Sequence, residues 1–142
     1  MLRRRSHSRL PRDLRATARS NGIGFASVPG YARRVPTIDD WNDLDVRVGT
    51  VLRAEPNDGA RDPSYKLWID FGDHGELQSS AKITDHYSPS DLVGRQVIAV
   101  TGFGSMRVGG FRSDVLVLGA VTEGGVILLG VDQAVDPGTG VA

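Results

Sequence analysis

The side chains best suited to catalysis are few in this sequence of 142 residues, and they are scattered along it. Cysteine is absent, which excludes disulfides, thiolate metal ligands and a thiol nucleophile. No two of the three histidines, His7, His74 and His86, have the spacing that places metal ligands on one helix face. The sequence therefore predicts no metal site and no cofactor.

Two short motifs resemble catalytic signatures, and both are incomplete. The stretch 102–107 opens like a dinucleotide-binding fingerprint, but Arg107 stands where the third glycine is needed and no helical pattern follows. Ser105 lacks the flanking glycines of a nucleophile elbow. The acidic run at 39–45 lacks the glycine and glutamate positions of a calcium-binding loop, so we expect it to cap a helix. These patterns predict a binding protein rather than an enzyme.

The remaining candidates are side chains suited to contact RNA. They are the polar, basic and aromatic residues at the end of one expected strand and in a later glycine-rich loop: Gln78, Ser79, Ser80, Lys82, Arg107, Phe111 and Arg112. Basic groups can neutralise phosphates, hydroxyls and amides can contact sugar or phosphate, and aromatic rings can stack on unpaired bases. The alternative interpretation is structural, with Phe111 in the core and Arg112 merely solvated.

The pattern of apolar residues predicts a mostly β fold that must position these side chains. Alternation and short apolar runs predict strands at 46–52, 66–71, 76–81, 96–100, 114–118 and 126–129. We expect helical turns at 37–44, a short helix or loop at 84–94 and a loop at 102–113. The alternation slips at Gly49, where we expect a bulge. This all-β pattern favours an OB-fold Greek-key barrel of five to six strands with short helices, and a β-sandwich is the competing fold.

The formal net charge of zero hides two parts of opposite charge. Residues 1–36 contain nine arginines and one acid, a charge of +8, so residues 37–142 carry −8. We expect 1–36 to be a disordered basic arm, because its apolar residues are too sparse to pack against so many like charges. Three explanations for the arm stay open: a nucleic-acid-binding tail, a targeting peptide, or an over-extended gene start with Val28 or Val35 as the true start.

Several segments resemble the tRNA-binding domain that is appended to some aminoacyl-tRNA synthetases and also occurs free. The segments that carry the resemblance are 44–51, 66–72, 78–84, 94–100 and 110–119, and the last three are similar to the CsaA branch of that family. The resemblance covers residues 41–142 and implies an OB-fold domain at 37–142 that forms a homodimer. It also implies binding of tRNA by shape and backbone, and, for the CsaA branch, binding of unfolded pre-proteins.

The resemblance also implies which side chains meet the ligand. The implied surface contacts are Ser79, Ser80, Lys82, Arg107 and Arg112. One departure weakens the implied phosphate clamp: family members often have prolines and paired basic residues before the motif at 110–113, whereas here residues 104–106 are Gly, Ser and Met.

A peptide-holding secretion chaperone with little or no RNA binding is the rival function. It needs exposed apolar surface, for which Trp68 and Met106 are candidates because both stand in polar contexts. A dimer interface explains Trp68 equally well, and the apolar strand at 126–129 also suits such an interface. No run of about 18 apolar residues occurs, so we expect a cytoplasmic protein without membrane insertion.

Overall fold

The computed structural model describes residues 34–142, which fall into two units, one ending at Asp43 and the other spanning Leu44–Ala142. The predictions made for the basic arm at 1–36 lie almost entirely outside the described residues, and the boundary at 36 stays a prediction. Within 34–142 no helix is long and apolar enough to cross a bilayer.

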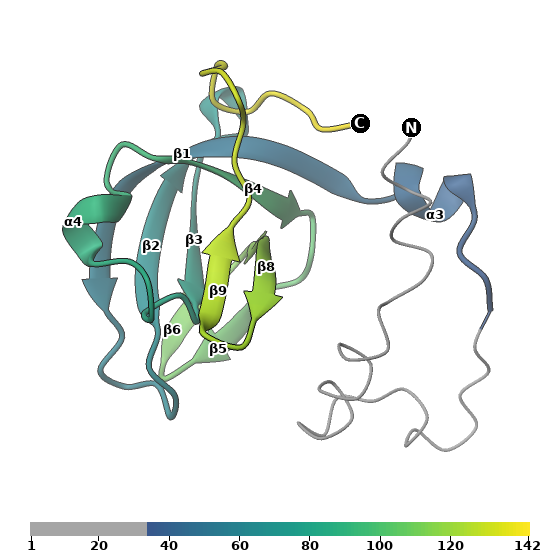
Figure 1. Ribbon diagram of the computed structural model, residues 1–142. Coiled ribbons are helices and arrows are strands. Elements are labelled where there is room, and N and C mark those ends of the chain that lie inside the picture. The colour runs from purple at the N-terminus through teal and green to yellow at the C-terminus, as the bar shows by residue number, and fades with distance from the viewer. Residues whose placement is uncertain (1–33) are drawn as a thin grey trace. The chain divides into compact units, whose positions relative to one another are not determined.

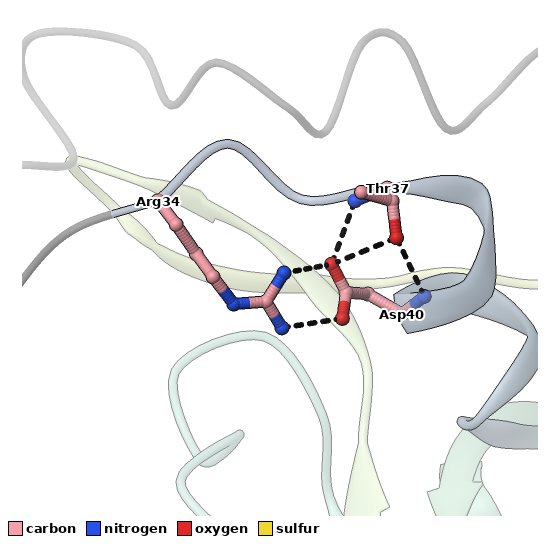
Figure 2. Close-up of polar contacts among 3 residues, drawn as sticks. All are labelled: Arg34, Thr37 and Asp40. Carbon is pink, nitrogen blue, oxygen red and sulfur yellow. Dashed lines mark hydrogen bonds and ion pairs between the residues drawn. The ribbon is translucent and has the colours of Figure 1, made fainter.

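The first unit contains the short helix α3 (Ile38–Asn42), which is held at its start by a capping box. Figure 2 shows the Asp40 carboxylate between Thr37 and Arg34. The Thr37 backbone N–H donates to Asp40 Oδ2 at 2.6 Å, and the Asp40 N–H donates back to Thr37 Oγ1 at 3.4 Å. Two Arg34 guanidinium nitrogens donate to the two carboxylate oxygens at 2.8 and 2.5 Å. The prediction of a capped helical turn within 37–44 is therefore confirmed, with Thr37 as the N-cap.

The Arg34 guanidinium, followed by the Thr37 N–H, lowers the pKa of Asp40 to about 2. Because this folded-state pKa lies below the ordinary value of 3.8, the interaction stabilises the cap above pH 3.8 and is lost as the pH falls through about 2. We expect a carboxyl-carbon NMR titration of Asp40 to show this low midpoint, and Arg34→Gln to move it up toward the ordinary value. An unchanged midpoint in Arg34→Gln would assign the low pKa to the helix cap alone.

The second unit is built on a five-stranded antiparallel sheet in the order β3-β2-β1-β4-β7. Its strands are β1 (Asp45–Pro56), β2 (Tyr65–Asp70), β3 (Glu76–Ala81), β4 (Gln96–Thr101) and β7 (Leu116–Val117). The 3-10 turn η2 (Gly72–His74) joins β2 to β3, and the short helix α4 (Pro89–Leu92) lies beside β1 (Figure 1). Two separate hairpins complete the unit: β5 (Met106–Val108) with β6 (Phe111–Ser113), and β8 (Gly119–Thr122) with β9 (Gly125–Leu128).

The sheet curls until its two ends approach each other. The Asp114 N–H donates to Gln78 O at 2.7 Å, and the buried Ser79 hydroxyl donates to Val115 O at 2.9 Å, so the edge strand β3 is bonded to the segment between β6 and β7. Curling lets one face of a single sheet enclose its own core. The prediction of an all-β OB-type fold with short helices is confirmed, and the competing β-sandwich is not the observed fold.

The strand β1 bends at Leu52, not at Gly49 as the alternation predicts. Gly49 pairs regularly with Val97 of β4, whereas the pairing with β2 skips a residue between Val51 and Arg53. Gly49 serves a different purpose, because a Cβ there would lie 2.5 Å from Ile69 Cγ2. The glycine therefore lets β1 pass close over the core side chains of β2.

The core lies inside the curled sheet. Its fully buried side chains come from β1, β2, α4 and β4 and from the turn after β2: Val51, Leu67, Ile69, Phe71, Leu92 and Val97. Leu67 and Ile69 face inward while Trp68 between them does not, which confirms the predicted alternation along 66–71. That alternation leaves the intervening side chains of β2 on the outer face of the sheet.

The segment 138–141 covers the part of β1 that β2 does not reach. The Gly138 N–H donates to Val48 O at 2.7 Å, and the Val141 N–H donates to Val46 O at 2.9 Å. Arg47 Nη1 donates to Gly138 O at 2.9 Å. Since β2 pairs with β1 only from Thr50 onward, this segment satisfies backbone groups that would otherwise form an open edge.

Two predicted loops or strands differ from the observed elements. The predicted loop 102–113 contains the hairpin β5–β6, which turns at Gly109 and Gly110, both with positive φ. The predicted strand 114–118 is shortened to β7, and the following residues 119–122 form β8, which pairs with β9. The reversal between β8 and β9 occurs at Glu123 and Gly124.

Candidate nucleic-acid interface

The outer face of β1, β2 and β3 carries two rows of polar, basic and aromatic side chains. In one row Arg53 of β1 lies opposite Trp68 of β2, which lies opposite Gln78 of β3. In the other row Lys66 of β2 lies between Glu55 and Ser80. Because alternate residues of a strand share a face, these two rows stand side by side on the surface opposite the core.

Two cations of these rows, Arg53 and Lys66, lie over aromatic rings. The Arg53 guanidinium carbon lies 4.2 Å from the Trp68 ring centroid, and Lys66 Nζ lies 5.4 Å from the Phe111 centroid. The rings of Trp68 and Phe111 meet edge to face, with centroids 5.4 Å apart and planes at 78°. Each exposed cation–π contact contributes about 0.5–1 kcal/mol. We call these four residues, Arg53, Lys66, Trp68 and Phe111, the cation–aromatic array.

The hairpin β5–β6 adds two further cations next to the array. Arg107 and Arg112 are directly opposite each other in the hairpin, and both are exposed. Arg107 Nη1 donates to Gly110 O at 2.7 Å, which fixes the guanidinium over the turn. Arg112 Nε lies 3.0 Å from Asp114 Oδ1, so part of its charge is compensated. Alternation places both guanidinium groups on the hairpin face opposite the one that carries Val108 and Phe111.

Backbone contacts hold this hairpin against the loop that follows β1. A Cβ on Gly59 would lie 2.6 Å from Gly109 O, so the two loops touch through their main chains. The buried Asn57 donates through Nδ2 to Val108 O at 3.1 Å and to Ser80 Oγ at 3.2 Å. These contacts fix the position of the hairpin relative to β1 and β3.

The sequence-predicted residues Gln78, Ser79 and Ser80 lie where β3 meets the hairpin β5–β6. Their hydrogen bonds are mainly to the hairpin and to the segment that follows it. Ser79 is only 1% exposed and donates to Val115 O, so the implied surface contact at Ser79 is contradicted by its burial. Gln78 Nε2 donates to Arg112 O at 2.7 Å. Ser80 receives the Asn57 amide on its hydroxyl, and its N–H donates to Ser113 Oγ. These residues position the hairpin.

Lys82 lies beyond the end of β3, away from the two rows. Its Nζ forms an exposed ion pair of 2.9 Å with Asp62 Oδ2 in the loop after β1. The Lys82 ammonium lowers the pKa of the Asp62 carboxyl. Phe111, by contrast, is half-buried within the array, so neither the core nor the fully exposed interpretation describes it.

Two adjoining hollows lie beside the hairpin β5–β6. One, of about 390 Å³, is lined by Phe103, Met106 and Leu116, which are half or more exposed, together with Ser113 and Asp114. The second, of about 490 Å³, shares Met106 and Leu116 and extends to Lys82 and Asp62. Of the two residues predicted to form an apolar surface, Met106 lines both hollows, whereas Trp68 lies in the array.

The sequence interpretation missed Arg53, Lys66 and Trp68 as members of the site. Alternation along 66–71 already places Lys66 and Trp68 on one outer face, and that signal was available. The pairing of Arg53 with Trp68 depends on the residue skipped at Leu52, which no sequence pattern marks. The array and the hairpin β5–β6 together contain four of the eight cations of residues 37–142.

Comparison with known proteins assigns this domain to a family. Residues 46–140 match the family described as "Putative tRNA binding domain". The chain is 38% identical over 103 residues to a methionine–tRNA ligase of Methanothrix thermoacetophila and 33% identical over 113 residues to that of Bacillus subtilis. These matches cover 72% and 78% of the chain but only 15% and 17% of the ligases.

Solved structures give the same assignment. The chaperone CsaA from Bacillus anthracis is 45% identical with a TM-score of 0.73, over 77% of this chain and 100% of that one. The CsaA chaperone protein from Picrophilus torridus is 41% identical with a TM-score of 0.72, over 75% of this chain and 99% of that one. Family model, sequence relatives and fold agree, and the chain belongs to the tRNA-binding domain family.

Proposed function

We propose that this protein is a non-catalytic tRNA-binding protein of the CsaA type, which contacts tRNA through the array and the hairpin β5–β6. The observation that carries the proposal is that half of the cations of a negatively charged domain lie on adjoining elements, Arg53 and Lys66 in the array and Arg107 and Arg112 on the hairpin. Phosphate binding depends on cations that displace counterions, so a domain carrying −8 over residues 37–142 needs such a local basic surface. The described arrangement supplies it next to stacking rings.

The array also explains why recognition is expected to be by shape and backbone. Arg53 and Arg112 already pair with Glu55 and Asp114, and none of the four cations is held in a rigid pocket. Cations on an open surface neutralise phosphates without reading base edges. The ligase relatives match only over a small part of their length, so their catalytic activity is not part of the proposal.

Chaperone activity toward unfolded pre-proteins is the second candidate function, and the two hollows favour it. Met106, at 64% exposed, lies with Phe103 and Leu116 on a surface that can accept apolar side chains of an extended segment. This surface adjoins the array, because Ser80 lines both hollows and lies opposite Lys66. The alternative function is a secretion chaperone that uses only this surface.

We further propose that the protein is a cytoplasmic homodimer. The hairpin β8–β9 places the exposed Ile127 and Leu129 on its outward side, whereas Val126 and Leu128 pack against the core. Burying exposed apolar surface against a second copy stabilises an assembly by about 25 cal/mol per Å². The interface predicted for the strand at 126–129 would then use its outward residues.

The test is a sizing experiment with the full chain at moderate salt. Free protein is first measured by light scattering, then mixed with purified tRNA or with a reduced, unfolded polypeptide. We expect tRNA to shift the protein to a larger species that dissociates as salt is raised. A shift with the polypeptide alone would support the chaperone alternative, and a shift with neither would contradict both functions.

A further inference from the structure

We propose that Trp68 and Phe111 are stacking sites for unpaired bases, so that the interface selects unpaired RNA segments over continuous duplex. The proposal rests on the tRNA-binding function proposed above and names the part of the ligand that this surface takes. Trp68 lies on the outer face of the sheet and Phe111 on the hairpin that contacts it; both rings are half-buried, each has a cation over it, and neither belongs to the core cluster. Such rings are platforms for nucleic-acid bases.

The angle between the rings decides which RNA structure they can accept. Their planes lie at 78°, so bases stacked on Trp68 and on Phe111 could not be parallel to each other. Successive bases in a duplex are parallel and stacked on one another, and their faces are hidden. A strand whose bases are splayed apart can place one base on each ring. The geometry therefore fits an unpaired loop or end.

The cations over the rings exchange places with the incoming bases. Base stacking on an aromatic ring is stronger than an exposed cation–π contact, so a base displaces Arg53 from Trp68 or Lys66 from Phe111. The displaced side chains are long and attached to neighbouring strand positions, and each then reaches the phosphate beside the stacked base. Glu55, which pairs with Arg53 in the free protein, loses this partner to the phosphate.

Tryptophan fluorescence gives a direct readout of this exchange. The chain has two tryptophans, so Trp41→Phe leaves Trp68 as the only one. We expect an oligoadenylate of about ten nucleotides, and tRNA, to quench Trp68 in this variant, because a stacked base lies against the ring. A blunt RNA duplex of equal length is expected to leave the emission nearly unchanged.

Affinity measurements with labelled RNA complete the test. Trp68→Leu should bind the oligoadenylate roughly 5- to 150-fold more weakly, and Trp68→Phe should retain most of the affinity because it keeps a stacking face. Val93→Ala is the control, since Val93 is exposed after α4, outside the array and both hollows, and this variant should bind like the parent protein. Circular dichroism checks that each variant is folded. If Trp68→Leu does not fold, the fluorescence experiment, in which Trp68 is intact, still tests the proposal.

The outcomes separate this inference from the proposed function. If tRNA binds but neither quenches Trp68 nor distinguishes Trp68→Leu from the parent protein, base stacking is wrong and tRNA binding stands. Equal affinity for duplex and oligoadenylate would overturn the preference for unpaired RNA. If the parent protein binds no RNA, the proposed function and this inference fail together.

Discussion

Replacing Arg107 and Arg112 together with glutamine is expected to weaken tRNA binding about 25- to 60-fold at 0.1 M salt. The estimate follows from counterion release, which contributes a salt slope of about −0.9 per phosphate contact on duplex and about −0.7 on single strands. Relative to 1 M salt, each contact is then worth about five- to eightfold at 0.1 M. Both guanidinium groups are exposed on the hairpin β5–β6 and can each meet one phosphate.

The measurement is fluorescence anisotropy of labelled tRNA over a salt series. The affinities of parent and double variant should converge toward 1 M salt, and the slope should fall by about 1.4 to 1.8. Arg95→Gln is the control, because its guanidinium lies 5.2 Å from the Tyr87 ring centroid and outside the array and hairpin. Parallel salt slopes for parent and double variant would remove the hairpin from the RNA contact surface.

Replacing Phe71 with alanine is expected to lower the free energy of unfolding by about 3–5 kcal/mol. Phe71 is 0% exposed and packs in the core cluster with Leu67 and Ile69. The loss combines the transfer free energy of a benzyl group with the cavity left behind, because the surrounding sheet relaxes only in part. For a domain of this size the melting temperature should fall by roughly 12–40 °C.

Phe103→Ala is the matched control for this prediction. Phe103 is 50% exposed, and its removal should change the free energy of unfolding by about 0.5 kcal/mol or less. Urea denaturation followed by circular dichroism gives both values. A loss as large for Phe103 as for Phe71 would mean that the loop after β4 is packed more tightly than its exposure indicates.

The fold was predictable where a local pattern decides it. Leu67, Ile69 and Phe71 alternate with polar neighbours, and the short turn after them forces the hairpin with β3, so both strands were predicted correctly. The hairpin β5–β6 was missed although Gly109-Gly110 between short strands is a known turn signal, because strands of three residues carry too little periodicity to register.

The site was predictable in its residue types and less so in its geometry. Arg107, Phe111 and Arg112 were expected to bind RNA from their chemistry alone. The position of Trp68 beneath Arg53 depends on a pairing register that is set by long-range contacts. The burial of Ser79 depends on how the sheet curls. Both features depend on contacts between segments that are distant in the sequence, and a local sequence pattern does not predict such contacts.

The contact between Gly59 and Gly109 couples two segments that are distant in the sequence. Their main chains lie so close that a β-carbon on Gly109 would come within 2.3 Å of the Gly59 carbonyl carbon. A substitution that adds a β-carbon at either position therefore requires the opposite loop to move away, so the loop after β1 and the hairpin bearing Arg107 limit each other's permitted sequences.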